Sequence, residues 1–588
     1  MSKLIFFYLL ILFSYYSFSQ QESVWVTHFE ESGFISTPDY NETMQYFQIL
    51  EDNSDFAELF TFGISPQNRE LKYLLATRED INGGKFPQTD SHIRKLSKPI
   101  VLIINGIHSG EIGGKDASMM LMREILITKE KEYLLDSLNL IVIPIFNVDG
   151  HERKSKYNRI NQNGPEEMGW RTTAQNLNLN RDWMKADAPE MQAMLRLIND
   201  WNPDFVIDTH TTDGADCQYT ITYSVEKHEN IFSETAEWLK KDFIFFLERE
   251  VTQKGYLIHP YVYLKNWNMG LDNGIIDWAS SPRLSTGYFA LRNRPALLIE
   301  THMIKPYKDR VYSTKAAIET TLEFVINNST KLKELNKQAD IDSRNLKHKY
   351  LPLAFSNSGN YEMINFKGYD YYWDSSAVSG TKRLVYTDRE KFLQIKYFDE
   401  LLITDSVKVA KGYYIPPEYS FLVEKLKLHG VNPNLITNDN RIEKVSRYKF
   451  KNVKLSENSY EGKQLVTLEY ETFTDEAVVL IGSYLFLSET SNARLLTHLL
   501  EPKSADSFIR WGFMNQIFEQ KEYYEDYVME KLAEEMLEND PELKREFEEK
   551  LRTDEEFKNN PRARLDFFYK RSPYPDKHLN VYPILRIE

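Results

Sequence analysis

Four short runs of consecutive apolar residues are the clearest pattern along the chain. They occupy residues 100–104, 140–145, 205–207 and 296–299. A run that is apolar at every position, without polar alternation, is typical of a strand buried on both faces. Segments with helical spacing of apolar residues, such as 117–124, lie between the runs. Strands that alternate with helices predict an α/β fold, with a mixed, mostly parallel sheet covered by helices on both faces.

Weaker signals precede this stretch. Residues 56–64 and 70–77 carry strand-like patterns on either side of a turn at 65–68. Thr37-Pro38 has the form of a helix N-cap followed by proline at the first helical position. We therefore expect a helix that begins at this dipeptide, followed by two strands.

The alternation of strands and helices fades after about residue 335. Residues 331–349 are polar and charged and predict a helix tail or a linker. Residues 350–490 hold short strand-like runs, and residues 522–570 are charge-rich and helical. Charges of this kind usually form a solvated face, so they do not indicate a binding site.

Side chains with metal-binding chemistry follow the buried runs. His108 and Glu111 come after the first run, His210 after the third and Glu300 after the fourth. The carboxyl ends of parallel strands meet at one edge of a sheet, where ligands bind. A catalytic zinc takes three protein ligands, such as imidazole nitrogens and a carboxylate, and keeps one position for water. A His-x-x-Glu pair alone is common on solvated loops, whereas the combination in one sheet is specific and predicts a zinc site.

The chain resembles the zinc carboxypeptidases over roughly residues 37–325. That family binds zinc through a His-x-x-Glu pair and a later histidine, which correspond here to His108, Glu111 and His210. The resemblance is carried, in the family's order, by Asn105-Gly106-Ile107-His108-Ser109-Gly110-Glu111, Asn147-Val148-Asp149-Gly150, Trp170-Arg171, Asn178-Leu179-Asn180-Arg181-Asp182-Trp183, Asp208-Thr209-His210, Ile276-Asp277-Trp278 and Leu298-Ile299-Glu300-Thr301.

This resemblance implies a role for each further site residue. Glu300 matches the catalytic glutamate, which takes a proton from zinc-bound water and returns it to the leaving amine. Arg171 matches the arginine that stabilises the developing oxyanion. Asn180 and Arg181 match the pair that holds the terminal carboxylate of a peptide substrate, for which a planar guanidinium is well suited.

The sequence departs from the family at two of these places. Asn178 stands where the family often has an aspartate that orients a zinc histidine, and an amide oxygen can accept the same hydrogen bond without charge. The family also uses a mobile tyrosine ahead of its catalytic glutamate. No position matches it clearly, and Tyr288 is the first candidate, with Tyr263 behind it.

Two questions about the site stay open at this level. His151 and His302 also follow strands and are rival metal ligands. Family members that prefer basic residues place an acid near 276–278, where this chain has Ile275 and Ile276. The resemblance therefore favours uncharged or apolar terminal residues.

Three functions remain as hypotheses. The first is a metallocarboxypeptidase that releases C-terminal amino acids from peptides. The second is a zinc amidohydrolase on the same scaffold, such as a deacylase of N-acyl amino acids or a hydrolase of cell-wall peptides. The third is a catalytically dead binding protein, which the intact ligands and Glu300 disfavour.

The amino-acid composition limits the possible binding partners but says less about the reaction. The net charge is −15 and the pI about 5.5, which argues against nucleic-acid and anionic-membrane partners. Cys217 is the only cysteine, so no intramolecular disulfide can form. Nothing in the sequence indicates an oligomeric state.

The first residues have the pattern of a leader peptide. Lys3 precedes an apolar run at 4–13 that is about half the length of a membrane-spanning helix, and small residues follow at a cleavage site. We therefore expect a secreted or periplasmic protein without stable membrane insertion. Too few residues separate this leader from the resemblance for a folded inhibitory propeptide. The predicted organisation is a signal peptide at 1–19, a zinc carboxypeptidase-like domain at 20–335 and a C-terminal α+β region of unknown role at 350–588.

Overall fold

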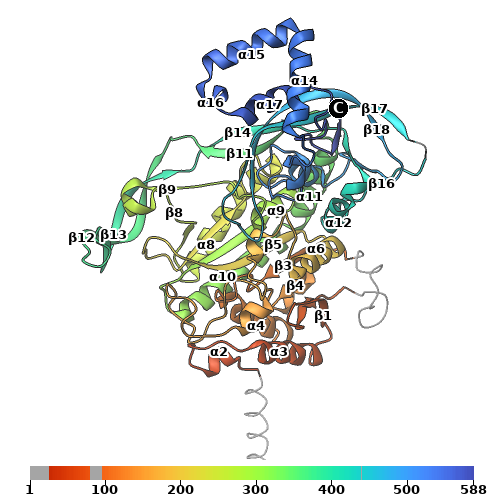
Figure 1. The fold of residues 1–588 in the computed structure, drawn as a ribbon. Coiled ribbons are helices and arrows are strands. Elements are labelled where there is room, and N and C mark those ends of the chain that lie inside the picture. Colours follow the sequence, from red (N-terminus) through yellow and green to blue (C-terminus); the bar gives the residue numbers. More distant parts are fainter. Residues whose placement is uncertain (1–24, 80–95, 439) are drawn as a thin grey trace, which may run out of the picture.

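The computed structural model describes residues 25–79, 96–438 and 440–588 (Figure 1). The predicted signal peptide lies outside these residues. None of the helices in the described ranges has the length and apolar character needed to cross a membrane.

An eight-stranded mixed sheet forms the centre of the N-terminal half. Its four middle strands, β4, β3, β5 and β10, are parallel neighbours, as the four apolar runs predicted. Antiparallel pairs flank them on both sides. In spatial order the strands are β1 (Ala57–Ile64), β2 (Glu70–Ala76), β4 (Asn139–Ile143), β3 (Ile100–Ile104), β5 (Phe205–Thr212), β10 (Ala296–His302), β6 (Ile221–Val225) and β7 (Ile258–Pro260).

Helices cover both faces of this sheet, which confirms the predicted fold class. Alternate residues of β3 show the two faces, because Val101 and Ile103 join one core cluster while Leu102 and Ile104 join the other. The first face packs against α3 (Tyr40–Asp52), α4 (Gly113–Leu126), α8 (Ile244–Gln253) and α10 (Tyr307–Asn327). The second packs against α6 (Pro189–Trp201) and α9 (Ser285–Leu291). Shorter helices are α2 (His28–Glu31), α5 (Val148–Glu152) and α7 (Ser233–Trp238).

The first predicted helix begins two residues later than expected. Its N-cap is Asp39, whose carboxylate accepts from the Glu42 N–H while the Glu42 side chain bonds back to the Asp39 N–H. This reciprocal capping box satisfies two N–H groups that the helix leaves free. The Thr37 hydroxyl instead donates to the buried Asp116 carboxylate at 3.1 Å, so the Thr37-Pro38 prediction was wrong.

The C-terminal half begins with α11 (Ser329–Arg344) and is built mainly of antiparallel strands. A long hairpin of β12 (Glu362–Ser375) and β13 (Lys382–Phe398) joins the short strands β8 (Tyr263–Leu264) and β9 (Ile275–Ile276) of the N-terminal half. A second pair consists of β11 (Tyr350–Asn357) and β14 (Leu401–Lys408). A six-stranded sheet contains β16 (Asn434–Leu435), β19 (Tyr484–Leu487), β15 (Gly412–Ile415), β20 (Leu585–Ile587), β17 (Arg441–Leu455) and β18 (Val466–Val479).

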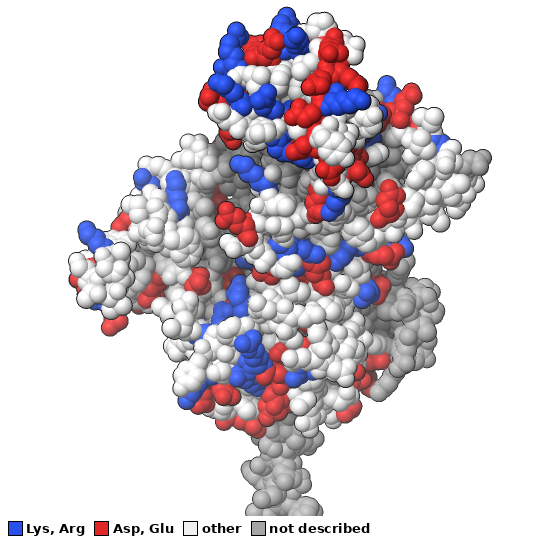
Figure 2. All heavy atoms as spheres, viewed as in Figure 1, with Lys and Arg blue, Asp and Glu red and all other residues white. Residues whose placement is uncertain are grey.

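The charge-rich segment is helical, as predicted. Asp540 and Asn560 cap the helices that begin at Pro541 and Pro561. The members are α14 (Asp526–Asn539), α15 (Pro541–Thr553), α16 (Glu555–Lys558) and α17 (Pro561–Tyr569). They surround a small apolar cluster of their own. Basic and acidic side chains intermingle on their outer surface (Figure 2), as expected of a solvated face.

One core cluster runs through both halves of the chain. It contains Trp183 and Met191 from the N-terminal half together with Tyr413 and Leu426 from the C-terminal half. The contributing C-terminal helices are α12 (Ser420–Leu428) and α13 (Ala493–Leu500). The two halves are therefore packed together by apolar contacts on one face of the main sheet.

Candidate active site

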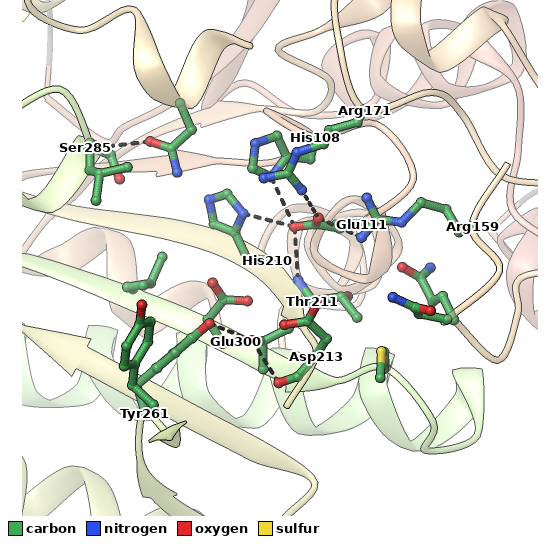
Figure 3. A pocket seen from close by; sticks show the side chains of 18 of the residues that line it. His108, Glu111, Arg159, Arg171, His210, Thr211, Asp213, Tyr261, Ser285 and Glu300 are labelled. Atoms are coloured by element: carbon green, nitrogen blue, oxygen red, sulfur yellow. Dashed lines mark hydrogen bonds and ion pairs between the residues drawn. The ribbon is translucent and has the colours of Figure 1, made fainter. Parts of the chain in front are cut away.

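The carboxyl ends of β3, β5 and β10 open into a cavity of about 850 Å³ (Figure 3). Seven of the eight site residues predicted from sequence line it. They are His108, Glu111, Arg171, Asn180, Arg181, His210 and Glu300. The sheet edge thus brings together side chains that are up to 192 positions apart (108 to 300) in the sequence.

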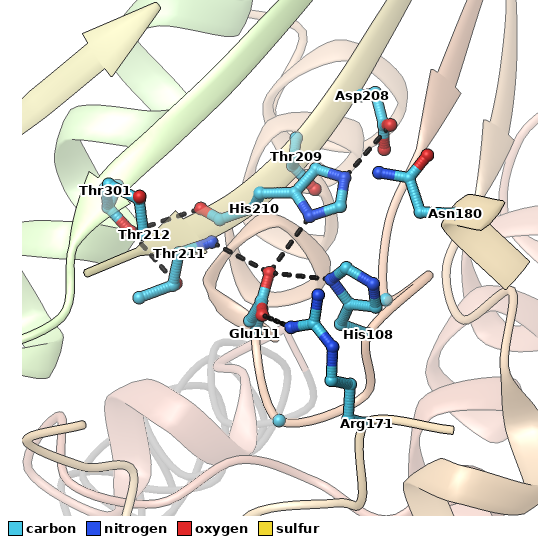
Figure 4. Close-up of polar contacts among 12 residues, drawn as sticks. His108, Glu111, Arg171, Asn180, Asp208, Thr209, His210, Thr211, Thr212 and Thr301 are labelled. Carbon is cyan, nitrogen blue, oxygen red and sulfur yellow. Dashed lines mark hydrogen bonds and ion pairs between the residues drawn. The ribbon is translucent and has the colours of Figure 1, made fainter. Parts of the chain in front are cut away.

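His108, Glu111 and His210 form a compact buried triad at the inner end of this cavity. Their ligand atoms all lie within 4.8 Å of one another, and no other such group occurs in the described ranges. The Nδ1 atoms of His108 and His210 lie 3.2 Å and 2.9 Å from the Glu111 Oε2. In Figure 4 the contacts of both rings meet at one oxygen of Glu111, so all three side chains aim at one point.

The outer nitrogen of each ring has a different partner. The Nε2 of His108 lies 2.9 Å from the amide oxygen of Asn178. The Nε2 of His210 lies 3.0 Å from a carboxylate oxygen of Asp208. The expected substitution of an amide for a carboxylate is therefore present beside His108, while His210 retains a charged partner. Such partners fix ring orientation and raise ligand basicity.

The protonation of the triad follows from burial and these partners. Burial, with help from Arg171, lowers the pKa of His108 to about 4. Burial also disfavours the charged form of His210, but Asp208 and Glu111 outweigh it and raise that pKa. The pKa of Glu111 falls well below its ordinary value, because His108 and Arg159 overcome the effect of burial.

Two imidazoles and one carboxylate are the ligand set that zinc accepts in hydrolytic sites. Both Nδ1 atoms point inward and both Nε2 atoms are held from outside, which leaves the inner atoms to the metal. The residues present therefore fit a zinc ion, and His108, Glu111 and His210 are its ligands.

Glu300 lies beside the triad and has a free oxygen. It is the parallel-strand neighbour of His210, and its buried Oε2 has no hydrogen-bond partner. Burial and the nearby Glu111 and Asp208 raise its pKa to about 8, although His210 opposes them. A carboxyl that is buried, unpartnered and open to the cavity is suited to proton transfer.

Two arginines approach the triad from the loop that follows α5. The Nη1 of Arg171 lies 3.2 Å from the Glu111 Oε1, and the Nη2 of Arg159 lies 2.7 Å from the same atom. Arg171 was predicted, whereas Arg159 was not, because no recognisable pattern surrounds it. Only the structure reveals the role of Arg159. Its side chain packs so closely against Gly110 that a Cβ at Gly110 would lie 2.8 Å from the Arg159 Cγ.

Asn180 and Arg181 come from a short 3₁₀ turn on the opposite wall. The Asn180 Oδ1 accepts from the Ser285 N–H at 3.1 Å and from the Trp183 Nε1 at 3.2 Å, which fixes the side chain. The Arg181 Nη1 donates to the Asn180 carbonyl at 2.7 Å. Both side chains line the cavity.

Tyr288, the eighth predicted residue, does not line the cavity. Its side chain is fully buried against Trp183, and its hydroxyl lies 3.1 Å from the His429 Nδ1. The prediction failed because Tyr288 belongs to α9, whose residues are all buried, and its ring packs into the core beside Trp183. Tyr263 does line the cavity, as does Tyr261, which sequence reasoning missed. The Tyr261 hydroxyl lies 2.6 Å from the Thr212 Oγ1.

The rival histidines lie away from the triad. The Nε2 of His302 lies 2.9 Å from the Ala215 carbonyl oxygen. His151 is buried between Lys115 and Glu152. Neither belongs to the group of possible metal ligands.

One wall of the cavity is apolar and aromatic. Its members include Ile276, Trp278, Leu284 and Leu298. The nearest acid in sequence, Asp277, is engaged by Lys227 at 2.7 Å and by His228 at 3.3 Å. This wall therefore presents no free charge from the 276–278 segment, as Ile276 suggested.

Comparison with known proteins gives the same family. Residues 43–312 match the family model described as zinc carboxypeptidase. The chain is 21% identical over 482 residues to Carboxypeptidase 2 of Trichophyton tonsurans, an alignment that spans 77% of this chain and 82% of the relative. With Carboxypeptidase 2 of Trichophyton rubrum it shares 21% identity over 502 residues, or 82% and 85% of the two chains.

Solved structures each match about half of this chain. The putative carboxypeptidase A from Shewanella denitrificans OS-217 matches 50% of this chain and 71% of its own, with 17% identity and a TM-score of 0.37. The carboxypeptidase A from Helicoverpa armigera matches 50% of this chain and 74% of its own, with 16% identity and a TM-score of 0.36.

Proposed function

The chain belongs to the zinc carboxypeptidase family, and from this premise we propose that it releases single residues from peptides that end in a free carboxylate. The observation that supports this most directly is the composition of one cavity. The zinc ligands and the unpartnered Glu300 lie in it together with Asn180 and Arg181.

The reacting end of the cavity holds an acid–base group and a cation. A bound zinc would polarise the scissile carbonyl and lower the pKa of a water molecule. Glu300 accepts a proton at its free Oε2 and delivers it to the leaving amine. The guanidinium of Arg171 donates to the oxygen on which negative charge develops.

The other end recognises the substrate's terminus. Arg181 meets the carboxylate with a planar fork of N–H groups, and Asn180 adds an amide donor whose orientation Ser285 and Trp183 fix. A substrate held in this way places its last peptide bond toward the triad. The apolar wall around Ile276 and Trp278 then receives an uncharged terminal side chain.

We also propose that the enzyme acts outside the cytoplasm. The charged start, the short apolar run and the small residues that follow it support this location. Peptides in the periplasm or the medium are then the substrates.

The test compares two peptides that differ only in a C-terminal carboxylate or amide. The amide leaves Arg181 without its charged partner, so we expect it to react at least about 10- to 100-fold more slowly. Arg181→Ala should slow only the free acid and remove the preference, and Arg181→Lys should restore part of it. Product masses identify the bond that is cut. Equal wild-type rates on both peptides would overturn the proposal and favour an amidase on the same scaffold.

A further inference from the structure

A loop of the C-terminal half reaches the active site at one residue. The half-buried carboxylate of Glu461 accepts a hydrogen bond from the backbone N–H of Asn178, with 2.9 Å between the Glu461 Oε2 and the Asn178 nitrogen. The two residues are 283 positions apart in sequence. A charged acceptor on a backbone N–H is among the stronger hydrogen bonds of a protein.

Asn178 links a zinc ligand to the turn that carries the carboxylate-binding pair. Its Oδ1 lies 2.9 Å from the Nε2 of the zinc ligand His108. The same oxygen accepts from the Asn180 N–H at 3.0 Å and caps the turn that carries Asn180 and Arg181. A shift of the Asn178 backbone therefore moves a metal ligand and the carboxylate-binding pair together.

The loop that carries Glu461 is held firmly by its neighbours. Glu461 and Gly462 both have left-handed backbone angles, with φ of 50° and 74°. Non-glycine residues rarely adopt this region without support. The Tyr460 ring stacks on Trp511. Lys463 forms an ion pair of 3.2 Å with Asp187, which follows the carboxylate-binding turn in the sequence. The strained position thus aims the carboxylate at Asn178.

We propose that Glu461 is a positioning residue of the active site, through which the C-terminal half sets the geometry of both His108 and the carboxylate-binding turn. The effect on substrate rests on the function proposed above, whereas the effect on metal affinity does not. Glu461 does not touch the reacting atoms, so it acts through Asn178.

The test uses the full-length protein with Glu461→Ala. Zinc affinity, measured by competition with a chelator, should fall about tenfold, the lower end for loss of a group that supports a ligand. The KM for the free-acid peptide should rise about tenfold and the acid-to-amide preference should shrink with it, while kcat stays within about threefold.

Two further variants separate positioning from folding. Glu461→Gln keeps an acceptor oxygen and should restore zinc affinity and KM to within about threefold of wild type. Glu461→Asn tolerates the left-handed backbone but shortens the side chain, so it should behave like Glu461→Ala even if the alanine variant folds poorly. Glu457→Ala, at an exposed position of the same loop, is the control and should match wild type.

The possible results distinguish the positioning role of Glu461 from the proposed function. Wild-type zinc affinity and wild-type KM in folded Glu461→Ala and Glu461→Asn proteins would overturn the positioning role. A wild-type enzyme without acid-to-amide preference would instead overturn the proposed function, while the zinc measurement would still test Glu461.

Discussion

The N-terminal and C-terminal halves of the protein contribute to the same cavity in different ways. The N-terminal half supplies the chemical groups, each at the end of a strand or in a loop next to the sheet, so the register of β5 and β10 alone makes His210 and Glu300 neighbours. The C-terminal half supplies individual contacts that support residues of the N-terminal half, such as the hydrogen bond of Glu461 with Asn178 and the ion pair of Asp506 with Arg283.

This difference separates what the reaction needs from what adjusts it. Loss of a metal ligand or of the proton carrier removes a group that the reaction itself uses. Loss of a supporting contact lets a loop shift while every reacting group stays present. Substitutions in the two halves should therefore differ in size and in the kinetic constant that they change.

The largest effect should come from the metal ligands. His210→Ala leaves two protein ligands, so zinc should no longer copurify with the protein and peptide hydrolysis should fall to background. Metal content by elemental analysis checks this. His302→Ala, at a buried histidine bonded to the Ala215 carbonyl, is the matched control and should retain its zinc. Full zinc occupancy in His210→Ala would contradict the ligand set.

The next largest effect should come from Glu300→Gln. The change keeps the shape of the side chain but removes the proton acceptor, so kcat should fall by about 10²–10⁴ while zinc and substrate still bind. Calorimetric titration with a peptide separates binding from turnover. A variant that keeps more than about a tenth of the wild-type rate would contradict the role.

The pH profile of the wild type tests the same residue. Glu300 must be ionised to accept a proton, and its raised pKa moves that ionisation above the ordinary value of 4.5. Activity should therefore be lost as the pH falls, with an acid limb between 4.5 and about 8; bound zinc pulls the limb toward the lower end. A limb below 4.5 would contradict a buried base.

A smaller effect is expected from the C-terminal half. The buried Asp506 accepts from the Arg283 Nε at 2.6 Å and from the Ser281 hydroxyl, and so holds the segment that carries Leu284 and Ser285 into the cavity. Asp506→Asn should raise the KM for an apolar C-terminal residue about three- to tenfold and leave kcat nearly unchanged.

Asp475→Asn provides the comparison. It removes an ion pair of 2.8 Å with Arg447 in the same half of the chain, at a residue that does not line the cavity. Its KM should match the wild type. Equal changes in both variants would mean that general destabilisation, and not support of the cavity wall, causes the effect.

The features that the sequence could predict also divide between groups at strand ends and contacts made by loops. The four apolar runs located the parallel strands, and the polar residues after them located the metal site, because sheet topology brings strand ends together whatever the side chains are. Tyr288 was misplaced because a tyrosine carries no periodic signal that separates a cavity wall from a core. Arg159 and Glu461 lie in loops whose partners are 48 and 283 residues away, and no local pattern encodes such contacts.

The core that runs through both halves also limits how this protein can be shortened. Cutting the chain after α11 would uncover the apolar side of α6, including Met191 and Met194, where Tyr413 and Leu426 belong to the same cluster. A truncated protein that contains only the N-terminal half would expose a large apolar surface and would be prone to aggregation. Recombinant production therefore requires both halves of the chain, although the zinc ligands come from the first half alone.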